Sequence, residues 1–162
     1  MNISAIVYTS NTGFTARYAT MLAQRTGLPC HEAKDAAQLP QGAPVLYLGW
    51  LCAGKIKGLQ EAMARFDVQA VCAVGLTLPQ LAEPEEMAKQ NKLGDRPFFY
   101  LPGGYDPKKV KGVYRFMMGM VRRGLRKNAG SPLVKHLLHA IQNGGDWVSE
   151  EALGPVLAWL EG

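Results

Sequence analysis

A short polar segment near the N-terminus has the clearest chemistry in this sequence. It consists of Ser10, Asn11, Thr12, Gly13, Phe14 and Thr15 and follows an apolar run at residues 3–8. Where a buried strand turns into a helix, the first helical amides lack partners and the helix dipole adds partial positive charge. Hydroxyl groups can donate to phosphate oxygens, and glycine allows close approach of the backbone. We therefore expect segment 10–15 to bind an anion without any basic side chain.

Segment 10–15 could also have a function other than anion binding. A turn rich in serine, threonine and glycine can simply cap the helix that follows it. A Walker A loop is excluded because the turn has no Gly-Lys-Ser/Thr, and the GxGxxG dinucleotide motif is also missing. Phosphate binding and helix capping remain as the two interpretations.

The elements that must position this segment alternate between strand and helix. Apolar runs predict strands at residues 3–8, 29–32, 44–49, 68–75 and 97–101, and the segments between them predict helices at 13–25, 56–65 and 81–92. Such alternation requires right-handed crossovers and a parallel sheet covered on both faces. We expect an α/β, three-layer, doubly wound sheet of five parallel strands in the order 2-1-3-4-5. A helical extension follows at 107–127, 132–142 and 149–161.

Length and composition are those of a single globular domain. The chain has 162 residues, of which 48% are hydrophobic, with no apolar run approaching the length of a membrane span. We expect one domain over residues 1–162, with a basic helical insertion at 105–130. The N-terminus has no export signal, and three cysteines fit neither a disulfide framework nor a metal motif, so we expect cytoplasmic residence.

Positive charge is concentrated after the last predicted strand. Eight of the 18 basic residues, but only one acid, lie between Tyr105 and Lys127. On a helix, one side carries Lys108, Lys111, Arg115, Arg122 and Arg126. The opposite side carries Val110, Val113, Tyr114, Met117, Met118, Val121 and Leu125.

Three roles of this helix remain open. It could pack on the domain with a solvated basic rim, lie on an anionic membrane or a partner protein, or form the wall of a pocket for a large apolar substrate carrying carboxylates. No nucleic-acid partner is expected, because aromatic interleaving and recognition motifs are missing.

The N-terminal segment resembles the phosphate signature of the flavodoxin family, which binds flavin mononucleotide (FMN). The matching positions are Ile6, Val7, Tyr8, Ser10, Gly13, Thr15, Ala19 and Leu22. One position differs from the signature: the chain has Phe14 where the family has asparagine. The resemblance implies a flavodoxin-like fold with FMN as its cofactor.

In flavodoxins the flavin ring lies between the loops that follow strands 3 and 4. By that resemblance, the first loop here contributes Trp50, Leu51, Cys52, Ala53, Gly54 and Lys55, and the second contributes Gly75, Leu76 and Thr77. Trp50 could stack on the ring or serve as a core aromatic, and Lys55 could stabilise negative charge on the reduced flavin. The second loop lacks the tyrosine that often stacks on the flavin in electron-carrier flavodoxins.

The C-terminal third resembles the short flavodoxin-like protoporphyrinogen oxidases of bacteria. The similarity rests on the PGGYDP segment at 102–107, the methionine-rich basic helix and the closing segment DWVSEEALGPVLAWL. It implies an FMN-dependent oxidoreductase that works with a redox partner protein or quinone, with peripheral contact to the inner membrane face through Lys108, Lys111, Arg115, Arg122 and Arg126. The alternatives are a flavodoxin-type electron-transfer protein and a binding module that has lost FMN. No catalytic acid or base can be assigned, and His136 and His139 lack a third metal ligand.

Overall fold

The chain folds around a mainly parallel β-sheet in a computed structural model that describes residues 2–162. Five parallel strands, β1 (Ala5–Thr9), β2 (Cys30–Glu32), β3 (Pro44–Cys52), β5 (Asp67–Gly75) and β6 (Phe98–Pro102), follow the order β2-β1-β3-β5-β6. A short strand, β4 (Lys55–Ile56), pairs antiparallel with β3. The central strands are buried on both faces, as expected for apolar runs in a parallel sheet.

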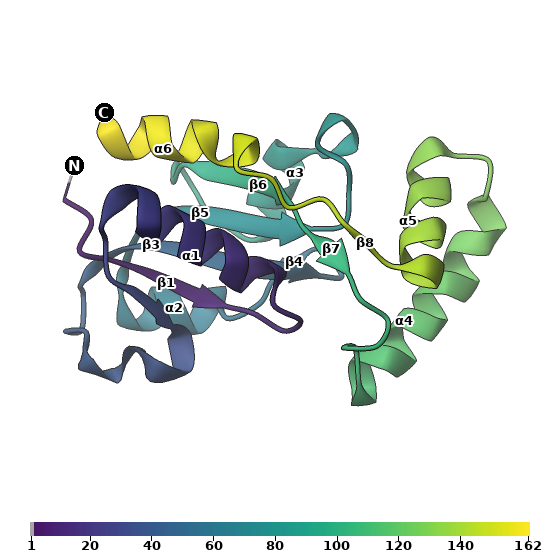
Figure 1. Ribbon diagram of the computed structural model, residues 1–162, viewed down its shortest axis with the longest axis horizontal. Coiled ribbons are helices and arrows are strands. Elements are labelled where there is room, and N and C mark those ends of the chain that lie inside the picture. The colour runs from purple at the N-terminus through teal and green to yellow at the C-terminus, as the bar shows by residue number, and fades with distance from the viewer. Residues whose placement is uncertain (1) are drawn as a thin grey trace.

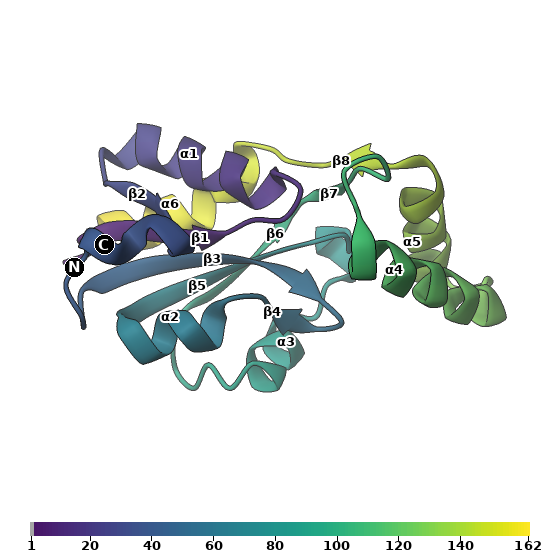
Figure 2. The ribbon, with the colours of Figure 1, turned by 90° about the horizontal axis from the view of Figure 1, so that it is seen from below.

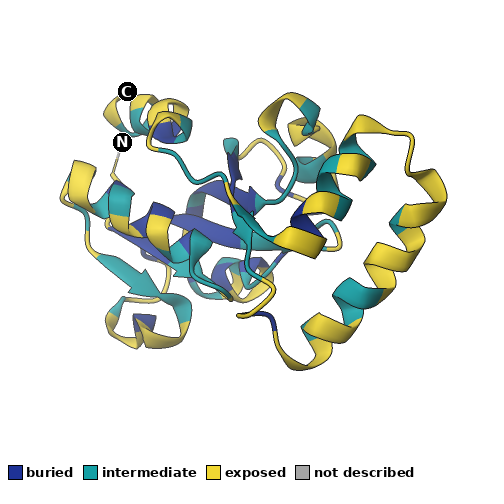
Figure 3. Ribbon diagram, turned by 45° about the vertical axis from the view of Figure 1, so that its right-hand side comes forward, coloured by how far each residue is buried: buried dark blue, intermediate teal, exposed yellow. Residues whose placement is uncertain are grey.

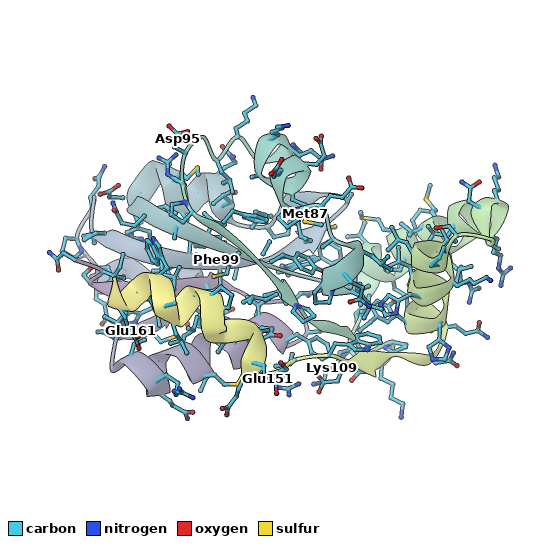
Figure 4. The ribbon with its side chains drawn as sticks, turned by 90° about the horizontal axis from the view of Figure 1, so that it is seen from above. Met87, Asp95, Phe99, Lys109, Glu151 and Glu161 are labelled. Carbon is cyan, nitrogen blue, oxygen red and sulfur yellow. The ribbon has the colours of Figure 1, made fainter. Side chains whose placement is uncertain are left out.

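Helices cover both faces of the sheet and give three layers (Figures 1 and 2). One face packs against α1 (Phe14–Thr26) and α6 (Gly154–Glu161), and Figure 4 shows Phe99 of β6 beside α6, where its ring lies 6.1 Å from that of Trp159. The other face packs against α2 (Leu59–Arg65) and α3 (Pro84–Gln90). The predicted three-layer α/β architecture is confirmed.

Local sequence explains the start and end of α1. Its buried residues Thr15, Tyr18, Ala19 and Leu22 have the spacing of one helical face. Gly13 before the helix and Gly27 after it both have positive φ, 101° and 72°, which glycine adopts without steric cost. The helix therefore begins directly after the turn that leaves β1.

A helical hairpin extends beyond the carboxyl ends of the parallel strands (Figures 1 and 2). It consists of α4 (Gly112–Leu125) and α5 (Pro132–Asn143), joined through a 3-10 turn at Arg126–Asn128. Its base is a small antiparallel pair, β7 (Gly104–Tyr105) with β8 (Gly145–Asp146). Further 3-10 turns lie at Ala33–Gln38, Pro79–Leu81 and Glu151–Leu153.

Two predicted boundaries were wrong. The strand expected at 44–49 continues to Cys52 and turns back into β4, because Ala53 and Gly54 both adopt positive φ, 50° and 78°. That tight turn suits antiparallel pairing, and it delays the helix expected from residue 56 until Leu59.

The basic helix expected from residue 107 begins at Gly112, which has φ 60°. Lys108 and Lys111 therefore precede the helix. Val113, predicted on the apolar side of this helix, is 65% exposed. Figure 3 shows that α4 has no buried residue along its length.

Candidate functional site

A cavity of about 270 Å³ lies where the carboxyl ends of the strands meet the helical hairpin. Eleven of the fifteen predicted site residues line it: Ser10, Asn11, Thr12, Phe14, Thr15, Trp50, Leu51, Cys52, Ala53, Gly75 and Leu76. These residues come from three separate chain segments, which the parallel sheet brings to one edge. Ligands of open α/β sheets bind at this edge, outside the carboxyl ends of the strands.

The turn from β1 to α1 presents amides and hydroxyls to the first cavity. Ser10 Oγ accepts hydrogen bonds from the backbone N–H groups of Gly13 (3.2 Å) and Ala16 (3.4 Å). Among residues 2–162, no protein acceptor is recorded for the amides of Asn11, Thr12, Phe14 and Thr15. Ser10 thus caps part of the helix N-terminus while several donors remain free for a ligand.

Thr15 adds a hydroxyl to this turn. The residue is only 1% exposed and lines the first cavity. Gly13, the remaining predicted residue of the turn, is not part of the cavity wall. Its φ of 101° lets the chain turn from the strand into the helix.

Phe14, the one position that departs from the flavodoxin signature, packs against β7. A Cβ atom at Gly104 would overlap the Phe14 ring, so the ring lies directly on the glycine backbone. This contact joins the Ser10 to Thr15 turn to the base of the helical hairpin. The departure from the flavodoxin pattern therefore has a packing role.

Helix α1 supplies no basic side chain to the turn Ser10 to Thr15. Arg17, one turn into α1, donates to the Asp146 carboxylate of β8 at 2.6 Å. Burial alone would raise the pKa of Asp146, but the hydrogen bonds from Arg17 and the Val148 amide outweigh it and lower that pKa. Anion binding at the turn would depend on amides, hydroxyls and the helix dipole.

Trp50 stands between the sheet and the hairpin. Its ring meets that of Tyr114 from α4 edge to face, with centroids 5.1 Å apart and an interplanar angle of 76°. The Lys57 ammonium lies 5.9 Å from the Trp50 centroid and 5.7 Å from that of Tyr114. Trp50 therefore lines the cavity and also contacts α4.

Lys55 does not join the first cavity. Its ammonium donates to the carbonyl oxygen of Gln90 on α3 at 2.6 Å, because the β3–β4 turn directs Lys55 toward α3. Lys55 is therefore not part of the wall of either cavity. Lys57, two residues later, is the cation that lies near Trp50, and the sequence did not predict this position. Its position depends on the turn between β3 and β4, which the sequence pattern did not predict.

A second cavity of about 430 Å³ adjoins the first. The two share Leu51, Ala53, Gly75, Leu76 and Leu137 as walls, and the second also contains the predicted residues Gly54 and Thr77. Its outer side is formed by α3, including Met87, which Figure 4 labels. The two cavities together extend from the β1–α1 turn to α3.

The helical hairpin and the segment before it form an apolar wall of the first cavity, which is one of the three roles that the sequence left open for the basic helix. The residues of this wall are Val110, Tyr114, Met117, Met118, Val121, Leu125, Leu137 and Ile141. His136 of α5 fixes the hairpin to the loop after β5 through Nε2, 2.8 Å from the Leu76 carbonyl oxygen, and its ring packs edge to face with Trp147. His139 instead contacts Asn143. The spacing of the apolar residues in α5 could have indicated that one side of this helix is apolar. It could not have indicated which element that side faces.

A buried tyrosine supports the floor of the site. The Tyr47 hydroxyl lies 2.6 Å from the Lys57 carbonyl oxygen and 2.8 Å from Thr9 Oγ1. Burial raises the pKa of Tyr47 to about 12, although the Thr9 hydrogen bond acts in the opposite direction. These contacts join the end of β1 and the middle of β3 to the segment that leads into α2.

Comparisons with known proteins identify no relative. No protein-family model, no curated protein and no solved structure matches this chain. The assignment of a function therefore depends on the geometry described above and on the sequence motifs.

Proposed function

We propose that this protein is an FMN-binding, flavodoxin-like oxidoreductase. The observation that carries the proposal is the turn Ser10 to Thr15, with its free amides and the hydroxyls of Thr12 and Thr15, opening into the same cavity as Trp50. A phosphate requires several convergent donors at a helix N-terminus, and a flavin ring requires an apolar, partly aromatic slot. The turn and Trp50 offer groups of these two kinds on the walls of one cavity, which supports the proposal.

The strand order supports the flavodoxin-like assignment. Counting the parallel strands alone, β2-β1-β3-β5-β6 corresponds to 2-1-3-4-5, the order expected from the sequence. In this order the connections leave β1 and β3 in opposite directions, which opens a crevice at their carboxyl ends. The Ser10 to Thr15 turn and Trp50 flank that crevice.

Cavity size agrees with FMN only if both cavities take part. Ligand pockets for cofactors typically measure roughly 300 to 1,000 Å³. The first cavity, at about 270 Å³, falls just below this range, while the adjoining one adds about 430 Å³. We infer that the phosphate would lie at the turn and that the ring would extend past Leu51 and Leu76 toward the second cavity.

The chain's own residues would bind, orient and shield the cofactor. FMN supplies the redox chemistry when bound, since its ring can take up and release electrons. Thr12 and Thr15 would donate to the phosphate, Trp50 and Leu76 would border the ring, and the methionines of α4 would exclude water from it. Lys57, held over two aromatic rings, would place positive charge beside the ring.

Comparing FMN with riboflavin tests the phosphate site directly. The double variant Thr12→Ala with Thr15→Val should weaken FMN binding, because each loses a charge-assisted hydrogen bond of roughly 1.5 to 3 kcal/mol. Riboflavin lacks the phosphate, so its affinity should not change. Fluorescence titration of the flavin measures both dissociation constants.

Thr20→Ala with Thr26→Ala is the matched control. Both hydroxyls bond to carbonyl oxygens within α1, so they are committed away from the cavity. FMN affinity should stay at the wild-type value in this control. Equal losses for FMN and riboflavin in the Thr12/Thr15 variant would contradict the phosphate site, and failure of wild type to bind either flavin would favour a binding module without FMN.

The apolar wall from α4 and α5 supports a large apolar substrate. Together with the resemblance to protoporphyrinogen oxidases, it makes a porphyrinogen the first substrate to test, with a quinone as electron acceptor. Turnover monitored by porphyrin fluorescence would support the oxidase. Bound FMN that exchanges electrons with redox proteins but leaves porphyrinogen unchanged would favour the electron-transfer alternative.

A further inference from the structure

The outward side of α4 exposes an apolar stripe. All four large hydrophobic side chains recorded as exposed in residues 2–162 belong to this helix, and Phe116, Val113 and Met120 are 69%, 65% and 58% exposed. Their spacing of three and four residues places these three on one side of a helix. We call Val113, Phe116 and Met120 the α4 stripe.

The α4 stripe is distinct from the wall of the first cavity. At about 100° per residue, Tyr114, Met118 and Leu125 fall on a different side of α4 from the stripe. Those three side chains line the cavity, whereas the stripe residues do not. Packing in the first cavity therefore does not explain why Val113, Phe116 and Met120 are apolar.

Uncompensated positive charge is concentrated in the segment of the chain that carries the stripe. Residues 107–145 contain nine lysines and arginines and no aspartate or glutamate. Within the described residues, none of these nine forms an ion pair, since the recorded salt bridges involve Arg17, Arg25 and Lys34. On the helix, Arg123 borders the stripe, and Lys127 lies in the 3-10 turn that directly follows α4.

The position of the hairpin allows contact with a flat surface. Figures 1 and 2 show α4 and α5 projecting from the end of the molecule opposite both termini. The α4 stripe lies along a convex helix and is not part of either cavity. It can therefore approach an extended surface without interference from the sheet.

We propose that α4 attaches this protein peripherally to an anionic bilayer surface. The stripe enters the boundary between head groups and acyl chains, while the surrounding cations bind the anionic head groups. Charge complementarity favours this occupant, because a field of nine cations without a single acid matches a surface of distributed negative charge. No helix among residues 2–162 has both the length and the apolar character needed to cross a bilayer, so the contact is confined to the surface.

Vesicle co-sedimentation tests this proposal without reference to flavin. The probes are vesicles of phosphatidylcholine alone and vesicles that also contain about a third phosphatidylglycerol, a composition that gives a negative surface potential. We expect binding to the anionic vesicles only, and weaker binding as added salt screens the charges.

Two variants separate the contributions of charge and apolar contact. Arg123→Gln with Lys127→Gln should lower vesicle affinity about 25-fold, or about fivefold for each cation removed. Phe116→Ser with Met120→Ser should lower it roughly tenfold or more, because apolar area is lost from the inserted side. Both pairs are exposed, so the far-UV circular dichroism and thermal midpoint should stay close to wild type.

The matched control is Lys89→Gln with Lys92→Gln, which removes two exposed cations outside the hairpin. Vesicle affinity should stay within about twofold of wild type in this control. No binding to anionic vesicles, equal binding to neutral ones, or unchanged binding in the Phe116/Met120 variant would overturn the proposal. An acidic protein partner would then be the remaining explanation for the surface.

Discussion

Trp50, near the carboxyl end of β3, and Tyr114 on α4 pack edge to face with their ring centroids 5.1 Å apart. The contact joins the sheet to the helical hairpin at the edge of the first cavity. Because Lys57 lies over both rings, the same contact places a cation beside the site. The attachment of α4 and the shape of the cavity are thus coupled through one aromatic pair.

The Trp50–Tyr114 pair should show measurable coupling energy. In a double-mutant cycle with Trp50→Leu and Tyr114→Leu, we expect a coupling of about 0.5 to 1.5 kcal/mol, as found for aromatic pairs. Urea unfolding measures the free energy of unfolding of all four proteins. Phe116→Leu on the same helix is the control, and it should change stability by less than about 0.5 kcal/mol because the ring is exposed. Additive single-variant effects would show that the pair is not coupled.

Cys52 should be protected from alkylation by FMN. It lines the first cavity and is only partly buried, whereas burial raises the pKa of Cys72 and keeps that thiol unreactive. We expect iodoacetamide to modify Cys52 in the free protein and to do so at least several times more slowly with saturating FMN. Peptide mass spectrometry follows each site. Cys30, which lies outside both cavities, is the internal control, and equal protection of Cys30 would indicate a general change in stability.

Stability should fall at alkaline pH because of Tyr47. Its pKa is raised to about 12 in the folded protein, above roughly 10 in the unfolded chain, so the unfolded state loses its proton first. The stabilisation from Tyr47 is complete below pH of about 10 and is lost between about 10 and 12, with a maximum of about 3 kcal/mol. Urea unfolding between these pH values measures it.

Tyr47→Phe isolates that contribution from other tyrosines. The variant should be less stable at neutral pH by about 1 to 3 kcal/mol, because Thr9 and the Lys57 carbonyl lose a partner. Its stability should also decline less steeply than wild type between pH of about 10 and 12. Parallel pH profiles for the two proteins would contradict the role assigned to Tyr47.

Two glycine substitutions should have opposite effects. Gly58 has φ 76°, and an added Cβ would overlap the Tyr47 hydroxyl and Thr9 Oγ1, so Gly58→Ala should destabilise by several kcal/mol. Gly119 lies inside α4 with no atom within 4 Å of an added Cβ, so Gly119→Ala should stabilise by about 0.5 to 1 kcal/mol. Thermal unfolding compares both variants with wild type, and a stable Gly58→Ala would contradict the packing described at this corner.

Local patterns in the chain were enough to predict the layered α/β architecture and the turn at Ser10 to Thr15. A buried parallel strand is a continuous apolar run and a turn into a helix needs small polar residues, so each signal lies within a few neighbouring positions. Eleven predicted residues meet at one cavity because the carboxyl ends of parallel strands share an edge. This much follows from short-range spacing and the rules of sheet connection.

Long-range packing decided the rest. The turn at Ala53 and Gly54 extended β3 and directed Lys55 to Gln90, while Lys57 took the place beside the rings. The apolar positions of α4 divided between the cavity and an exposed stripe. Helical periodicity shows which side chains share a side, but the burial of that side depends on neighbours distant in the chain, and only the assembled fold specifies those neighbours.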